Sequence, residues 1–172
     1  KDAANDTVKG FDAVHVVVSN DSLQLWLGES KFYDDVNSAI NDAIDSINDH
    51  MQRDYLRAEF VAIVNKLDPQ WPHFDRLKSL LDPNNSLDNI FDAICIPVFV
   101  SYNSPVMRSH TEVTESFKAQ FEAEVRKHHA SFCSNHLPDS IIVHLFLFPM
   151  KDKTKLQQEF DKRLKTWQTI LT

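Results

Sequence analysis

Glycine is nearly missing from this chain of 172 residues, which contains only Gly10 and Gly28. At the usual frequency of about 7%, a protein of this length would contain roughly a dozen glycines. Glycine within or beside a strand permits a bulge or the close approach of a ligand to the backbone. The two glycines therefore single out the segment that they flank as one where backbone geometry matters.

Cysteines and long apolar runs are also scarce. Cys95 and Cys133 lie far apart in the sequence, and no apolar run reaches the roughly 18 residues that would span a bilayer. The first ten residues, KDAANDTVKG, show no signal-peptide pattern. We therefore expect a cytoplasmic protein without a membrane span. The length favours a single domain over residues 1–172, and the abrupt polar start is compatible with a missing N-terminal part.

Positive charge is in deficit, because 18 Lys and Arg face 25 Asp and Glu, for a net charge of −7. This balance argues against a free-standing protein that binds nucleic acid through its whole surface, since phosphate contacts depend mainly on Lys and Arg. Any DNA contact must be local or assisted by a partner. Many acids fall in DDVNSAINDAIDSINDH, residues 34–50, which predicts a solvated helix face, with a partner-binding face as the alternative.

Alternating and β-branched segments near the start of the chain predict a hairpin. Residues 11–18, FDAVHVVV, and residues 23–27, LQLWL, have the composition of strands. Between them, Ser-Asn-Asp-Ser at 19–22 is turn chemistry. We therefore predict two antiparallel strands joined by a short turn.

The remaining chain alternates helical patterns with apolar runs of strand length. Residues 93–102, AICIPVFVSY, and 141–148, IIVHLFLF, are near-continuous apolar runs that predict strands covered on both faces. The fold class is therefore α/β, a mixed sheet with an N-terminal antiparallel hairpin and flanking helices. Helices are expected, from periodicity and breakers, at about 34–51, 53–67, 74–81, 112–132 and 155–171.

The predicted hairpin brings two acids together. A turn through residues 20–21 or through residues 19–22 places Asp12 directly opposite Glu29. Opposed Cβ atoms in an antiparallel pair are about 4.5–5.5 Å apart, so the two carboxylates repel unless a cation neutralises them. Lys31 follows Glu29 by two residues and faces the same side of the strand. The arrangement predicts a metal site at this end of the hairpin.

These motifs resemble those of known nucleases. The residues GFD at 10–12 and LWLGESKFY at 25–33 are similar to the Asp…Glu-x-Lys signature of PD-(D/E)xK nucleases. More narrowly, GESKFY, the following DDVNSAINDAIDSI and the later IPVFVSYNS resemble the HamA family, the nuclease subunits of the Hachiman anti-phage system. The resemblance covers most of the chain, but its sharp motifs lie in the first third.

The resemblance implies a PD-(D/E)xK (restriction-endonuclease-like) core and a Mg²⁺-dependent DNA nuclease, with Mn²⁺ as the alternative ion, that works with a helicase partner, HamB. By position, Asp12 and Glu29 match the metal-binding acids of the family, and Lys31 matches its catalytic lysine. The resemblance also implies that the Ser30 carbonyl is a further metal ligand. No small-molecule cofactor is implied. Two departures are visible: Gly10-Phe11 replaces the nominal proline, and the helix that normally precedes the Asp strand, with any acid on it, is absent.

Other residue groups give weaker signals. His129 and Cys133, four apart on a predicted helix, could share a zinc, although a polar helix end is the simpler interpretation. Tyr102 and Asn103 follow a predicted strand at an edge where α/β sheets bind ligands. The lysine-rich C-terminal helix could touch phosphates, but a solvated face is the simpler interpretation. A catalytically silent module that keeps the fold to dock a partner is the alternative to the nuclease.

Overall fold

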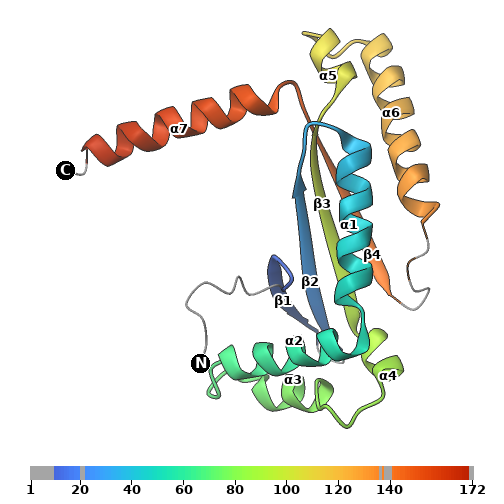
Figure 1. The fold of residues 1–172 in the computed structure, drawn as a ribbon, viewed down its shortest axis with the longest axis vertical. Coiled ribbons are helices and arrows are strands. Elements are labelled where there is room, and N and C mark those ends of the chain that lie inside the picture. Colours follow the sequence, from blue (N-terminus) through green and yellow to red (C-terminus); the bar gives the residue numbers. More distant parts are fainter. Residues whose placement is uncertain (1–9, 20–21, 136, 138–140, 171–172) are drawn as a thin grey trace. The chain divides into compact units, whose positions relative to one another are not determined.

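The computed structural model describes residues 10–19, 22–135, 137 and 141–170. Four strands form one sheet in the order β1-β2-β3-β4 (Figure 1). The strands are β1 Ala13–Val18, β2 Leu23–Phe32, β3 Ile94–Asn103 and β4 Ile142–Met150. The helices are α1 Val36–His50, α2 Arg53–Lys66, α3 Phe74–Leu80, α4 Leu87–Phe91, α5 Pro105–Ser109, α6 Glu115–Cys133 and α7 Lys153–Ile170.

The hairpin has the predicted register. Strands β1 and β2 pair antiparallel from Ala13 opposite Gly28 to Val18 opposite Leu23. The Ser19 N–H donates to the Ser22 carbonyl at 2.9 Å, which closes the connection between the strands. Strand β2 continues to Phe32, beyond the predicted end at Leu27. Extended by one position, this register puts Asp12 opposite Glu29, but the strand pairing itself ends at Ala13 and Gly28, and Asp12 precedes β1.

The third strand makes the sheet mixed. The Leu25 N–H donates to the Ala93 carbonyl and the Tyr33 N–H to the Ser101 carbonyl, so β2 and β3 run parallel. The predicted α/β class with a mixed sheet and flanking helices is confirmed. Two short helices, α4 and α5, were not predicted. Helix α5 has a local cause, since Ser104 caps its first turn by accepting from the Met107 N–H at 3.0 Å.

Two compact units divide the described chain. The first contains residues 1–30, 43–98 and 136–145, and the second contains residues 31–42, 99–135 and 146–172. The division crosses β2, β3, β4 and α1, each of which contributes residues to both units. The expectation of one domain over residues 1–172 stays a prediction.

Helix α1 supplies one side of the core. The side chains that it buries recur at helical spacing, as the stripe predicted from sequence requires. They are Val36, Ala39, Ile40, Ala43, Ile44 and Ile47. Strand β2 buries Leu25 and Leu27, and β3 buries Ile96, Val98 and Val100. Helix α1 starts at Val36, so the acids Asp34 and Asp35 precede it instead of forming its first turn as predicted.

Strand β4 is less buried than its composition predicts. Its residues alternate between exposed and half-buried positions, from Ile142 to Pro149, whereas the sequence predicted a strand covered on both faces. Phe99 on β3 is also exposed, so the same prediction is wrong for that residue. The physical reason is that the side of the sheet on which the Phe99 and Phe148 rings lie 5.6 Å apart is largely uncovered by the described residues. None of the helices in the described chain is long and apolar enough to cross a membrane.

Candidate functional site

Asp12 contacts β2 directly. Its Oδ2 accepts a hydrogen bond from the Ser30 backbone N–H at 2.8 Å, across the open end of the hairpin. The bond follows from the register, because Asp12 is the residue before Ala13, which pairs with Gly28. An exposed carboxylate is thus held against the backbone next to Glu29.

Glu29 is buried, with 5% of its surface exposed. It alternates along β2 with Leu25 and Leu27, which are also buried, so strand geometry directs all three to the same side. Burying a carboxylate is costly unless a charge, hydrogen bonds or a cation compensates it. One ionisable neighbour is His50, whose Nδ1 lies 3.8 Å from Glu29 Oε2.

Two aromatic rings fix the position of His50. The imidazole stacks on Tyr55 at a centroid distance of 4.8 Å and meets the edge of Phe11 at 4.7 Å. Its Nδ1 is buried and has no hydrogen-bond partner within the described part of the chain. Burial, with the charges of Glu59 and Glu29, raises the pKa of Tyr55. The Nδ1 atom of His50 therefore lies beside the buried Glu29 carboxylate without a hydrogen bond among the described residues.

Lys31 lies in the second unit, where it pairs with an acid of α1. Its Nζ is 2.8 Å from Asp42 Oδ2, and the same oxygen accepts from the Tyr33 hydroxyl at 2.9 Å. The hydrogen bond that Lys31 donates lowers the pKa of Asp42, and the hydrogen bond that Tyr33 donates lowers it further. In turn, the hydrogen bond to the Asp42 carboxylate raises the pKa of Tyr33. Lys31 is thus oriented by a carboxylate that is ionised at neutral pH.

The acids of the hairpin fit the donor chemistry of magnesium. Mg²⁺ takes oxygen ligands, is usually bound through one or two carboxylates, and keeps several waters. Asp12 and Glu29 supply two carboxylates from facing segments of the hairpin, with Asp12 bonded to the Ser30 N–H beside Glu29. Among the described residues no group of three or more His, Cys, Asp or Glu is spaced to hold a metal ion. The chemistry of the two carboxylates fits magnesium, and a site built from these two acids alone would have to be completed by water or other oxygen ligands.

The glycines that flank these acids are explained by packing. A Cβ on Gly28 would lie 3.2 Å from Ala13 Cβ and 3.8 Å from Pro97 Cγ, so the missing side chain lets β1 and β3 approach β2. A Cβ on Gly10 would lie 3.1 Å from the Glu59 carboxylate. Neither glycine has a positive φ. The atoms that come close to the two glycines are therefore protein atoms, whereas the sequence analysis considered a bulge or the approach of a ligand.

Tyr102 and Asn103 join a different polar cluster in the second unit. The buried Tyr102 hydroxyl donates to Glu124 Oε1 at 2.8 Å, and burial is the main cause that raises its pKa. Asn103 donates to Asp34 Oδ1 at 2.8 Å and accepts from the Lys153 N–H at 2.7 Å. A hollow of about 460 Å³ here is lined in part by Asp35, Glu124, Lys127 and His128. These contacts give Asn103 a structural role at the strand end.

The histidine-rich end of α6 forms no recognised metal cluster among the described residues. Cys133 Sγ lies 3.5 Å from His129 Nε2, which is a weak contact along one helix face. His128 is buried, and burial lowers its pKa. His136, a further histidine of the same segment, lies outside the described residues.

Sequence reasoning missed two residues near the predicted site. Asp42 was assigned to a solvated acidic face, and its partners Lys31 and Tyr33 come from the preceding strand and loop. His50 was not considered, although it follows the buried Ile47 by three residues and so lies next to the apolar stripe. Periodicity could have placed His50 on the inner side of α1, but no local signal could have placed it beside Glu29.

One comparison with known proteins gives a match. The model of the HamA family matches residues 1–164 of the chain. No curated protein and no solved structure matches it. The PD-(D/E)xK core therefore stays a prediction from the motifs.

Proposed function

The chain belongs to the HamA family, which gives it a role in Hachiman antiviral defence, and from this premise we propose that it is a metal-dependent DNA nuclease that works with a helicase partner. Asp12 and Glu29 would hold Mg²⁺, or Mn²⁺ in its place, with the Ser30 carbonyl as a further ligand. Lys31 would act on the reacting phosphate. The reaction is hydrolysis of a phosphodiester bond by water.

The hairpin register is the observation that supports this proposal. It makes Asp12 and Glu29 the next opposed pair after Ala13 and Gly28, and Asp12 reaches β2 through the bond to Ser30. A one-residue slip would send one of the acids to the other side of the strand. The register of β1 and β2 therefore supports the proposal that these two acids share a cation.

A divalent ion bound here would polarise the scissile phosphate, lower the pKa of a water and stabilise the leaving oxygen. Glu29 contributes a carboxylate in a buried setting, where electrostatic interactions are stronger than in water. Asp12 contributes an exposed carboxylate, already oriented by the Ser30 N–H. One acid thus anchors the site from the interior and the other bounds it toward solvent.

Lys31 follows Glu29 by two residues on β2, and alternate residues of a strand face the same side. Its compact ammonium can orient a water or offset negative charge that develops in the transition state. Asp42, which also accepts from the Tyr33 hydroxyl, holds the resting lysine and so limits the side-chain freedom that must be lost on substrate binding. Release from Asp42, or a shared contact, is required before the ammonium engages a phosphate.

The charge of the chain supports a partner that binds DNA. With a net charge of −7, the chain has no excess of cations with which to neutralise a DNA backbone. A basic helicase subunit would supply the positive charge that contacts the phosphates, and it would deliver the DNA strand to the site. Tight, salt-sensitive DNA binding by the isolated chain at physiological ionic strength would contradict this part of the proposal.

The decisive experiment is cleavage of duplex and single-stranded DNA by the helicase complex across a Mg²⁺ titration, with and without EDTA. We expect Glu29→Gln, which keeps the size of the buried side chain, and Lys31→Ala to abolish cleavage. Asp12→Asn should weaken metal dependence. Losing one well-placed donor such as Lys31 costs on the order of 10²–10³ in rate. Glu122 and Lys118, two exposed residues of α6 that pair with Arg126 and Glu115, give matched controls, because Glu122→Gln and Lys118→Ala remove the same charges elsewhere.

A second readout separates metal binding from chemistry. Mn²⁺ binding, measured by electron paramagnetic resonance, should be lost in Glu29→Gln and kept in Lys31→Ala.

The alternative function is a catalytically silent docking module, which is favoured by the lack of a three-residue metal cluster among the described residues. Cleavage that survives EDTA, or a Lys31→Ala variant that cuts at the wild-type rate, would replace the nuclease by this alternative.

A further inference from the structure

Helix α7 has an apolar stripe that is not covered by any of the described residues. Phe160, Leu164, Trp167 and Ile170 recur at helical spacing, and each is 58–67% exposed. No residue of the 18-residue helix is buried. An exposed apolar stripe of this size on a soluble chain marks an interaction surface.

A second apolar surface lies on the sheet. Phe32, Phe99, Phe146 and Phe148 are 40–52% exposed, and we name this set the phenylalanine face. The rings of Phe99 and Phe148 lie 5.6 Å apart, and Phe146 alternates with Phe148 on β4. Gly28 and Pro97 contact across β2 and β3, so their alternates Phe32 and Phe99 share that side of the sheet.

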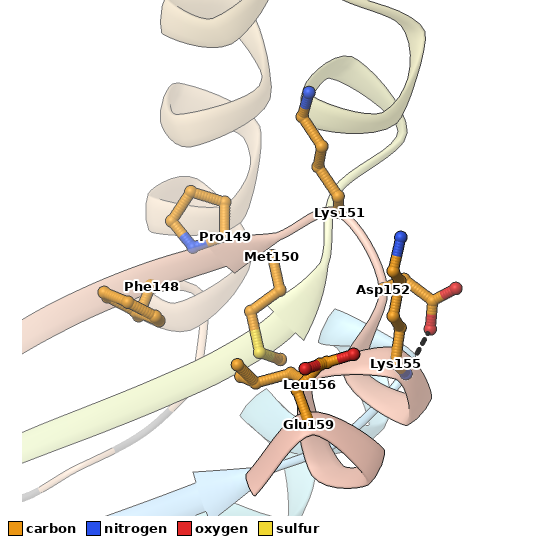
Figure 2. A pocket seen from close by; sticks show the side chains of 8 residues that line it. All are labelled: Phe148, Pro149, Met150, Lys151, Asp152, Lys155, Leu156 and Glu159. Atoms are coloured by element: carbon orange, nitrogen blue, oxygen red, sulfur yellow. Dashed lines mark hydrogen bonds between the residues drawn. The ribbon is translucent and has the colours of Figure 1, made fainter. Parts of the chain in front are cut away.

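The two surfaces meet at a hollow of about 420 Å³ between the end of β4 and the first turns of α7. Figure 2 shows the side chains that line it, which include Phe148 from the phenylalanine face, Met150, and Leu156 from the apolar side of α7. The helix stripe and the phenylalanine face are therefore parts of one continuous apolar surface. Continuity favours a single occupant that contacts both parts.

We propose that α7 of one chain packs its apolar stripe on the phenylalanine face of a second copy, and that the contact is reciprocal. Each chain carries both complementary surfaces, which is the requirement for a closed two-fold dimer. This inference is independent of the proposed nuclease activity, because it uses none of the residues near Asp12 and Glu29.

The start of α7 argues against packing on its own sheet. The Lys153 N–H donates to Asn103 Oδ1, and Asp152 caps the helix by accepting from the Lys155 N–H at 3.0 Å. The Lys153 ammonium lies 4.8 Å from the centre of the Phe32 ring. A helix of 18 residues is a rod of about 27 Å, so its stripe can reach its own sheet only if these contacts break. A second copy needs no such rearrangement.

The apolar area suits a stable dimer. Large apolar side chains bury about 150–250 Å² each when fully covered. With four such side chains on the helix and four on the sheet, each about half exposed, two reciprocal contacts would bury on the order of 1,600 Å² in total, which matches a standard protein interface. The stripe alone, paired with another α7, would bury much less.

Sedimentation velocity of the chain over a concentration series tests the proposal. We expect a dimer, and we expect Leu164→Glu/Trp167→Glu and Phe99→Ser/Phe148→Ser each to raise its dissociation constant at least about 100-fold. The matched control is Gln158→Glu/Thr169→Glu on the opposite side of α7, which should change the constant less than about threefold. Circular dichroism checks that each variant is folded.

Mixing the two defective variants makes the test specific. A heterodimer of Leu164→Glu/Trp167→Glu with Phe99→Ser/Phe148→Ser retains one intact helix-to-sheet contact, so mixing should restore part of the association. A wild-type chain that stays monomeric at all concentrations would overturn the proposal. So would a dimer that is insensitive to the sheet substitutions, because it would form through α7 alone.

A disulfide trap distinguishes the second copy from the same chain. In a Cys133→Ser background, which removes the exposed thiol and leaves the buried Cys95, Leu164→Cys and Phe99→Cys are combined in one chain. Mild oxidation should give covalent dimers on a denaturing gel. A disulfide formed only within one chain would refute the proposed dimer, because it would show that α7 packs on the sheet of its own chain.

Discussion

Helices α1 and α7 both have apolar stripes, yet the stripe of α1 is buried in the core and that of α7 is exposed. The stripe of α1 contains two alanines, Ala39 and Ala43, among isoleucines, and all of these side chains are buried. The stripe of α7 contains large side chains such as Phe160 and Trp167, which are exposed. Small residues let a helix approach a sheet closely, whereas bulky ones suit insertion into a separate surface. Amphipathicity therefore predicts a helix and its apolar side but does not identify the partner of that side.

The connections of the two helices also differ. Asp35 caps α1 by accepting from the Ser38 N–H at 2.8 Å, just after β2 has ended against β3. Asp152 caps α7 in the same way, just after β4. Because both helices start with a capped turn next to a strand, local chemistry does not separate them. The difference lies in the long-range contacts of their stripes.

The largest expected effect comes from the α1 stripe. Ile40 is fully buried, so Ile40→Ala should lower the free energy of unfolding by about 2–5 kcal/mol through lost burial and the cavity left behind. Urea denaturation measures the change. Asn41→Ala, at the next, exposed position, is the control and should shift stability by less than about 0.5 kcal/mol. Equal effects at the two positions would contradict the assignment of the stripe to the core.

The caps should show the same contrast on a smaller scale. Asp35→Ala should cost about 1 kcal/mol of global stability, because it removes the cap of a buried helix. Asp152→Ala should lower the helical circular dichroism signal and leave the global unfolding midpoint of the monomer unchanged. A global loss in Asp152→Ala equal to that in Asp35→Ala would mean that α7 is part of the cooperative core.

The Asp35 cap also predicts a pH dependence. Hydrogen bonds from Ser38 lower the pKa of Asp35 below its ordinary value of 3.8. The lowered pKa contributes stability that is fully present above pH 3.8 and is lost as the pH falls through the folded-state value. The stability difference between wild type and Asp35→Asn should therefore shrink below that pH, as measured by urea denaturation at several acidic pH values. A difference that grows with acidity would refute the assignment.

The smallest expected effect belongs to the α7 stripe. Leu164→Ala should change monomer stability by less than about 0.5 kcal/mol, since the side chain is largely exposed. The measurement is urea denaturation at protein concentrations below the dissociation constant of the proposed dimer, with Gln158→Ala as the control on the opposite side. A loss above about 1 kcal/mol under these conditions would show that α7 packs against its own chain.

The candidate site shows the same division between local and long-range information. The turn at residues 19–22 and the strand pattern predicted the register, which the pairing of Ala13 with Gly28 confirms. The roles of Asp12, Glu29, Ser30 and Lys31 stay predictions. His50 beside Glu29, and Asp42 beside Lys31, could not be predicted, because each contact joins residues that are distant along the chain.

Local sequence patterns were enough to predict the α/β class, most of the helices and the hairpin register, because each depends on side-chain periodicity or turn chemistry between near neighbours. Three features could be learned only from the folded chain: α1 is buried and α7 exposed, β4 lies at an edge, and an imidazole lies beside the buried carboxylate of Glu29. The reason is that an apolar side chain favours burial wherever it is, but its identity does not specify which distant residue will cover it. That choice is made by contacts between residues distant in sequence, on which local patterns carry no information.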